Sequence, residues 1–120
     1  MKRDFDLVRQ LVFAIENHSS GFAPSELHIE GFTEEQIGYH LFLMLQANLI
    51  NGCDVTHLGS KSPEAIATSL TPSGHDFADT ARSDTIWNQA KVTVKEKGGA
   101  VSFAILTQLL QNLCRTALGL

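Results

Sequence analysis

The most informative absence in this sequence is that of basic side chains from one long stretch. Between Gln10 and Ser60 there is neither a lysine nor an arginine, while the same stretch holds six acidic residues. The whole chain of 120 residues carries nine basic and 13 acidic residues, which gives a net charge of −4. Because proteins bind nucleic acids mainly through lysine and arginine contacts with phosphate, this balance disfavours general nucleic-acid binding.

Other features are scarce as well, and each absence narrows the class of protein. No apolar run reaches the roughly 18 residues that span a membrane, and the opening Met1-Lys2-Arg3 is followed at once by acidic residues, unlike a signal peptide. The two cysteines, Cys53 and Cys114, are distant in sequence, which favours free thiols in a reducing cytoplasm. With 43% hydrophobic and 18% charged residues, we expect a soluble, cytoplasmic protein that folds as one domain over residues 1–120.

A helix is predicted between Thr33 and Asn48. Thr33 and Gln36 have the spacing of a capping box, in which each side chain accepts a hydrogen bond from a free amide of the first turn. Two glutamates follow Thr33, where the helix dipole favours negative charge, and apolar residues then recur at helical spacing. Asn48 belongs to a residue type that ends helices in the left-handed conformation.

A β-hairpin is predicted directly after this helix. It would pair roughly residues 49–58 with residues 65–70, across the turn-rich stretch 59–63. Thr71 and Pro72 then have the order of an N-cap and the first helical position, where the missing N–H of proline costs nothing. The hairpin is therefore expected to lead straight into another helix.

Helical spacing and capping residues predict the remaining helices. They cover about residues 3–17, 72–82 and 85–97, and a last helix begins after Ser102. The stretch 22–31 is less regular. Within it Pro24–Leu27 suits a single helical turn, and Leu27–Ile29 alternates like a short strand that would join the hairpin.

Two resemblances add to this interpretation. The segments His40–Ile50 and Leu70–Phe77 resemble winged-helix transcription regulators, in which a recognition helix ends in a Gly-Leu-Ile type turn and the wing leads to a Leu-Thr-x-x-Gly motif. That resemblance implies DNA binding. The whole chain also resembles an uncharacterised bacterial and prophage family, a domain of unknown function. The marks of that family are Met1-Lys2-Arg3-Asp4, Glu30-Gly31-Phe32-Thr33, Tyr39-His40-Leu41, Gly74-His75-Asp76-Phe77, Trp87-Asn88 and Lys97-Gly98-Gly99.

The predicted fold class is α+β and mostly α. We expect a winged-helix-like domain with a small antiparallel β-hairpin as its wing, followed by a C-terminal helical extension. Within the single domain, the winged-helix-like core covers residues 1–82 and the C-terminal helices cover residues 83–120.

Surplus apolar surface favours a non-enzymatic protein-interaction module. Residues 41–45 are apolar all round their helix, and one helix on a small domain does not easily bury every side. The last helix has a similarly broad apolar face. A protein partner or a second copy in a homodimer would cover both, whereas the alternative is that the helices fill one core together. The candidate interface residues are Phe42, Leu43, Leu109, Leu110 and Leu113.

A DNA-binding transcriptional regulator is the alternative function. Glu34 and Glu35 at the start of the predicted recognition helix would repel phosphate, so this function would depend on basic residues elsewhere. The candidate nucleic-acid contacts are Lys2, Arg3, Arg9, Lys61, Lys91 and Lys95.

Metal, cofactor and catalytic sites are not predicted. In a strand, Cys53 and His57 would lie about 13 Å apart, too far to share an ion. Ser73, His75 and Asp76 occur close together but without a nucleophile elbow or a phosphate-binding loop. They are expected to form the first turn of a helix, and we predict that the protein is not an enzyme.

Overall fold

The chain runs through five helices and one β-hairpin, and the computed structural model describes all 120 residues. This is the mostly helical α+β fold predicted from the sequence. The chain divides into two compact units, residues 1–76 and 77–120, with the boundary inside α3. None of the helices combines the length and apolar character needed to cross a membrane. In chain order the elements are α1 (Phe5–Glu16), α2 (Glu34–Gln46), β1 (Ile50–Asp54), β2 (Ala65–Leu70), α3 (Pro72–Thr80), α4 (Asp84–Glu96) and α5 (Phe103–Ala117).

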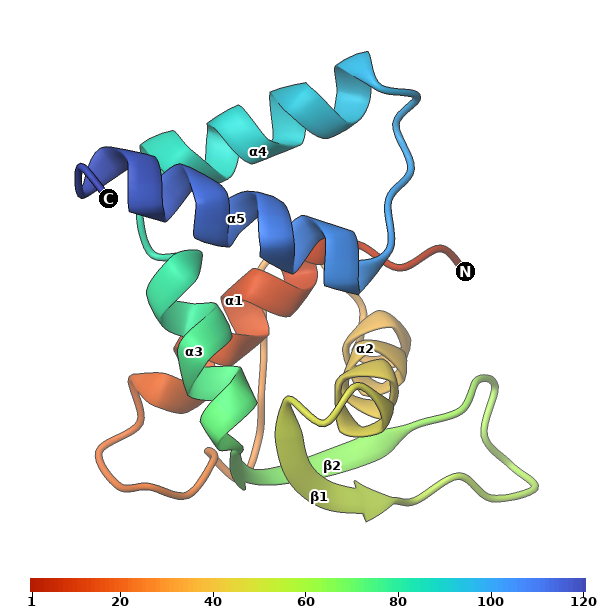
Figure 1. Ribbon diagram of the computed structural model, residues 1–120. Coiled ribbons are helices and arrows are strands. Elements are labelled where there is room, and N and C mark those ends of the chain that lie inside the picture. Colours follow the sequence, from red (N-terminus) through yellow and green to blue (C-terminus); the bar gives the residue numbers. More distant parts are fainter. The chain divides into compact units, whose positions relative to one another are not determined.

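Helix α2 is the centre of the first unit. The predicted capping box is confirmed: Gln36 N–H donates to Thr33 Oγ1 (3.1 Å), and Thr33 N–H donates to Gln36 Oε1 (2.8 Å). Asn48 follows the helix with a φ of 61°, the left-handed conformation expected of it. The helix packs against α1 and against both strands (Figure 1). The residues of α2 that face this core are Ile37, His40, Leu41 and Met44.

A buried histidine joins α2 to the beginning of α1. His40 is only 2% exposed. Its Nε2 accepts a hydrogen bond from Asp4 N–H (2.9 Å), and its Nδ1 lies 2.8 Å from the carbonyl oxygen of Gln36. Because Nε2 accepts, the ring hydrogen sits on Nδ1 and is donated to Gln36. Asp4 is also the N-cap of α1, so His40 fixes the start of that helix.

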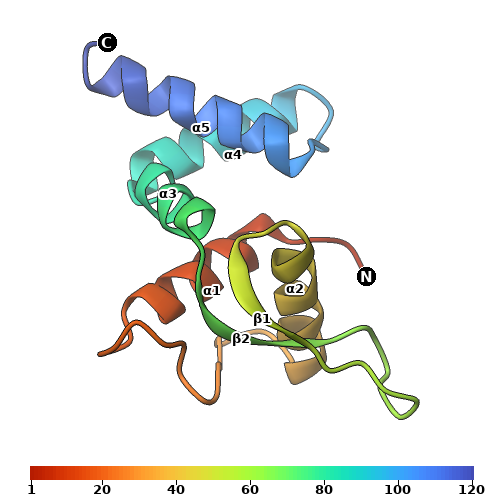
Figure 2. The same ribbon diagram turned by 60° about the horizontal axis from the view of Figure 1, so that its bottom comes forward.

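The hairpin is shorter than predicted on its first strand. β1 ends at Asp54, because the carboxylate of Asp54 accepts a hydrogen bond from Thr56 N–H (2.9 Å) and turns the chain out of the ladder. Residues 55–64, called the wing loop below, connect the strands and project from the first unit in both views (Figures 1 and 2). A register shift beside Gly52 bends the hairpin, and a Cβ at Gly52 would collide with the carbonyl oxygen of Ile66.

The predicted third strand is wrong. Leu27–Ile29 does not pair with the hairpin, and Pro24–Leu27 does not form a helical turn. One backbone hydrogen bond reaches β2, from Ala23 N–H to the carbonyl oxygen of Thr68 (2.8 Å). After Ala23 the chain makes no further backbone hydrogen bond to β2.

Thr71 joins four elements of the first unit. Its buried hydroxyl donates to the carbonyl oxygen of Asn48 (2.6 Å) and accepts from Gly74 N–H (3.0 Å), while its own N–H donates to Leu49 O (3.0 Å). The end of α2, the entry to β1, the end of β2 and the start of α3 therefore meet at one residue. The chains approach so closely that a Cβ at Gly74 would collide with the carbonyl oxygen of Leu49.

The second unit contains an antiparallel helix pair. α4 and α5 lie side by side (Figures 1 and 2). Ser83 and Ser102 cap them as predicted, each accepting a hydrogen bond from a first-turn N–H at 3.2 Å. Gly98 and Gly99, which end α4, both have positive φ. The buried side chains of this unit include Phe77, Trp87, Ala90, Leu106 and Leu110.

We expect Thr71→Val to lower the free energy of unfolding by about 2–3 kcal/mol. The substitution keeps the size and β-branching of the side chain but leaves Asn48 O and Gly74 N–H without their partner. Urea titration followed by circular dichroism measures the change. Thr71→Ser is the matched control, because it keeps the hydroxyl and should retain most of the stability. Equal midpoints for Thr71→Val and wild type would contradict the role of this hydroxyl.

Candidate functional site

A cleft opens between the beginning of α2 and the wing loop. Its volume is about 620 Å³. Three carboxylates line it, those of Glu34, Glu35 and Glu64, and they face a single ammonium group, that of Lys61. The remaining lining residues are Thr33, His57, Gly59, Ser60 and Ser62.

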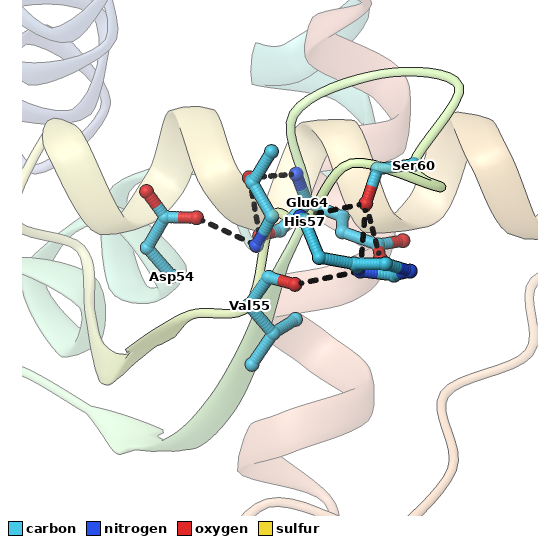
Figure 3. Close-up of polar contacts among 6 residues, drawn as sticks. Asp54, Val55, His57, Ser60 and Glu64 are labelled. Atoms are coloured by element: carbon cyan, nitrogen blue, oxygen red, sulfur yellow. Dashed lines mark hydrogen bonds and ion pairs between the residues drawn. The ribbon is translucent and has the colours of Figure 1, made fainter.

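Hydrogen bonds within the wing loop fix the shape of this cleft (Figure 3). Ser60 Oγ donates to Glu64 Oε1 (3.0 Å), accepts from His57 N–H (3.1 Å), and lies 3.0 Å from His57 Nδ1. His57 Nδ1 is also 3.2 Å from the carbonyl oxygen of Val55. The residue types are those of a serine–histidine–acid triad, but the serine hydrogen points at the carboxylate rather than at the imidazole. These hydrogen bonds therefore join residues of the wing loop to one another.

Two further contacts tie the wing loop to its surroundings. Ser62 Oγ donates to Glu35 Oε1 (2.7 Å), which joins the loop to α2. At the other end, Thr56 Oγ1 donates to the carbonyl oxygen of Glu64 (3.3 Å) and accepts from Glu64 N–H (3.0 Å). Hydrogen bonds from the side chain and the backbone N–H of Thr56 hold the pKa of Asp54 below its ordinary value. The wing therefore keeps a negative charge at its base.

The predicted nucleic-acid contacts are spread over several elements. Lys2 and Arg3 precede α1, and Arg9 lies within it; both guanidinium groups rest on phenylalanine rings, Arg3 on Phe5 (4.7 Å) and Arg9 on Phe13 (5.0 Å). Lys61 is the one basic residue of the wing loop. The last two candidates belong to α4 in the second unit, and they are Lys91 and Lys95.

The predicted interface residues differ in exposure. Leu110 is fully buried, so it belongs to the core and not to a surface that a partner contacts. Phe42 and Leu43 of α2 are half-buried, and the ring of Phe42 stacks on that of Tyr39 at 6.3 Å. Those two side chains are thus less available than the sequence predicted. The half-buried members on α5 are Leu109 and Leu113.

Sequence reasoning missed the most exposed apolar side chains of the helix pair. Val92 of α4 is 55% exposed and Ile105 of α5 is 52% exposed. Ile105 precedes Leu109 and Leu113 at intervals of four residues, so this second stripe was visible in the sequence. A shallow hollow of about 640 Å³ lies beside it, lined by Thr85, Asn88, Gln89, Val92, Thr93 and Leu113.

The structure places no metal-binding cluster around the histidines and cysteines. No three His, Cys, Asp or Glu side chains are grouped so that they would hold an ion. Cys53 is exposed and Cys114 is half-buried, and both thiols are free. The thiol of Cys114 donates to the carbonyl oxygen of Thr80 (3.4 Å) at the end of α3. Its contact is thus with the backbone.

Comparison with known proteins places this chain among bacterial relatives. Residues 2–100 match the model of a family described as "Hypothetical protein (DUF2513)". A protein of Haemophilus influenzae described as "Uncharacterized protein" is 36% identical over 116 residues, which cover 94% of this chain and 95% of the relative. No solved structure matches the chain. The resemblance to an uncharacterised bacterial family is confirmed.

We expect the protein to bind random duplex DNA only weakly at physiological salt. The carboxylates of Glu34 and Glu35 stand at the start of α2 and repel phosphate. Fluorescence anisotropy with labelled DNA measures this affinity. A variant with Glu34→Lys and Glu35→Lys should bind DNA more tightly than wild type, because attraction replaces repulsion. Submicromolar, steeply salt-dependent binding by the wild type would contradict the prediction.

Proposed function

Because the chain belongs to the family described as "Hypothetical protein (DUF2513)", whose description names no activity, we propose a function from the geometry of the molecule. We propose that the protein is a non-enzymatic interaction module of the cytoplasm that self-associates. The surface that carries this proposal is the α4–α5 face, defined by Val92, Ile105, Leu109 and Leu113.

The supporting observation is an uncharged apolar stripe next to a hollow. Val92 and Ile105 are both more than half exposed, and the hollow beside Val92 and Leu113 has no charged residue in its lining. Exposed aliphatic side chains gathered on one face are typical of a surface that a partner covers. Because the lining of the hollow carries no charge, no ion has to be desolvated there when the surface is buried.

A second copy of the chain is the partner that this face suits. In a two-fold symmetric dimer the same patch meets itself, so a charged patch would meet like charge. The α4–α5 face avoids that repulsion. Its apolar residues lie on two antiparallel helices, and two such pairs would form a four-helix arrangement. A specific interface of ordinary size buries about 800 Å² on each chain.

A DNA-binding regulator is the second candidate function. It is favoured by the Leu70–Gly74 motif. In this motif the hydroxyl of Thr71 donates to the carbonyl oxygen of Asn48 and accepts from Gly74 N–H. It is disfavoured by the acidic beginning of α2 and by the scattering of the basic residues. We therefore propose that the winged-helix-like core serves as a scaffold. The hydrogen bond from Ser60 to Glu64 supports the non-enzymatic part, because it uses the hydroxyl hydrogen in holding the wing loop together.

Ile105→Glu is expected to yield a folded monomer. The side chain is exposed within one chain, so a glutamate is tolerated there, but in the dimer it would place buried charge on both copies. Self-association should weaken by about tenfold or more. Size exclusion coupled to light scattering over a concentration series measures this.

The matched control is Gln111→Glu, which adds the same charge at an exposed position on the side of α5 away from Ile105, Leu109 and Leu113. This variant should associate like the wild type. A wild-type protein that stays monomeric at millimolar concentration would overturn the proposal, and so would equal weakening by Ile105→Glu and Gln111→Glu.

A further inference from the structure

A second groove lies on the first unit, beneath the place where a third strand was predicted. Its volume is about 440 Å³. One wall is the irregular segment 24–28, the opposite wall is Ile66 and Ala67 of β2, and the floor is formed by α2. The apolar residues of the groove are Leu27, Ile37, Leu41 and Ile66.

The β2 wall of this groove has an open edge. The sheet contains only β1 and β2, so β2 has a strand on one side alone. On its other side a single backbone hydrogen bond is made, from Ala23 N–H to Thr68 O. After Ala23 the chain makes no further backbone hydrogen bond to β2. The side chain of Ile66 on β2 is 53% exposed. An unpaired edge next to a groove that presents the exposed apolar side chain of Ile66 is the setting in which an extended peptide adds as a strand.

The charge around the groove selects the kind of peptide. Glu26 and Glu34 line it, both are exposed, and neither is engaged in an ion pair. No lysine or arginine occurs between Gln10 and Ser60 to neutralise them. The first unit as a whole carries ten acidic and four basic residues. A partner with lysine or arginine beside an apolar residue would complement this surface, whereas nucleic acid would be repelled.

We propose that this groove binds an extended basic segment of a partner protein, which adds to the open edge of β2. An apolar side chain of the segment rests on Leu27 and Ile66. Its basic side chains pair with Glu26 and Glu34. This surface is separate from the α4–α5 face, so the inference does not depend on self-association.

The test uses short labelled peptides and fluorescence anisotropy. The probe is a peptide of alternating lysine and valine; the comparison peptide has glutamate in place of lysine. We expect saturable binding of the lysine peptide, weakened by added salt, and no binding of the glutamate peptide. Methylating the backbone nitrogens of alternate residues, in each of the two possible sets, should abolish binding for one set, because strand addition needs those N–H groups.

Two variants locate the binding site. Ile66→Lys should weaken binding about tenfold, because it fills the groove with like charge. The matched control Leu58→Lys adds the same charge to the exposed wing loop, outside the groove, and should bind nearly as well as wild type. If Ile66→Lys does not fold, the double variant Glu26→Gln with Glu34→Gln replaces it, with an expected weakening of about fivefold.

Three results would overturn this inference. They are equal binding of the lysine and glutamate peptides, equal binding by folded Ile66→Lys and Leu58→Lys, and absence of saturable binding by the wild type. The oligomeric state separates this inference from the proposed function. If Ile66→Lys disrupted self-association while Ile105→Glu did not, a second copy would be the occupant of the groove. That outcome would contradict both assignments, whereas peptide binding by a monomeric wild-type protein would contradict only self-association.

Discussion

The first unit depends on one buried hydroxyl, that of Thr71. It joins the carbonyl oxygen of Asn48, just after α2, to the first-turn N–H of Gly74 in α3, at the point where β2 ends and β1 begins. The N–H of Gly74 would otherwise be buried without a partner, at a cost of about 1–3 kcal/mol. The contact leaves no room for a side chain at Gly74. The hairpin is therefore held in place at its base, while the wing loop is held by its own network of hydrogen bonds and by the bond from Ser62 to Glu35.

Holding the hairpin against α2 gives the first unit two hollows with acidic lining residues beside the start of α2. Glu34 lines both of them. In the second unit basic residues outnumber acidic ones, five to three. Its α4–α5 face carries exposed aliphatic side chains. An acidic surface is unsuited to pairing with itself, and an uncharged one is suited to it. We therefore assign a basic partner segment to the first unit and self-association to the second.

The parts of the fold that local chemistry determines could be predicted from the sequence. Thr33, Ser83 and Ser102 marked helix starts correctly because a cap depends on residues within one turn. The third strand was predicted wrongly because the alternation of Leu27–Ile29 does not show whether a segment reaches the sheet, and here the chain makes one backbone hydrogen bond to β2, at Ala23. The hydrogen bond from Asp4 N–H to His40 Nε2 could not be predicted from the sequence, because the two residues are 36 positions apart. Leu110 and Ile105 share one apolar helix, and only the packing of that helix shows which is core and which is surface.

The central claim is that the α4–α5 face is covered by a second copy of the chain. Hydrogen–deuterium exchange of the wild-type protein at micromolar and at millimolar concentration tests it most directly. The account predicts that exchange slows at the higher concentration for peptides covering residues 85–93 and 105–116, while peptides covering α2 and the hairpin are unchanged. Exchange that is identical at the two concentrations throughout α4 and α5, or slowed only in the first unit, would contradict it.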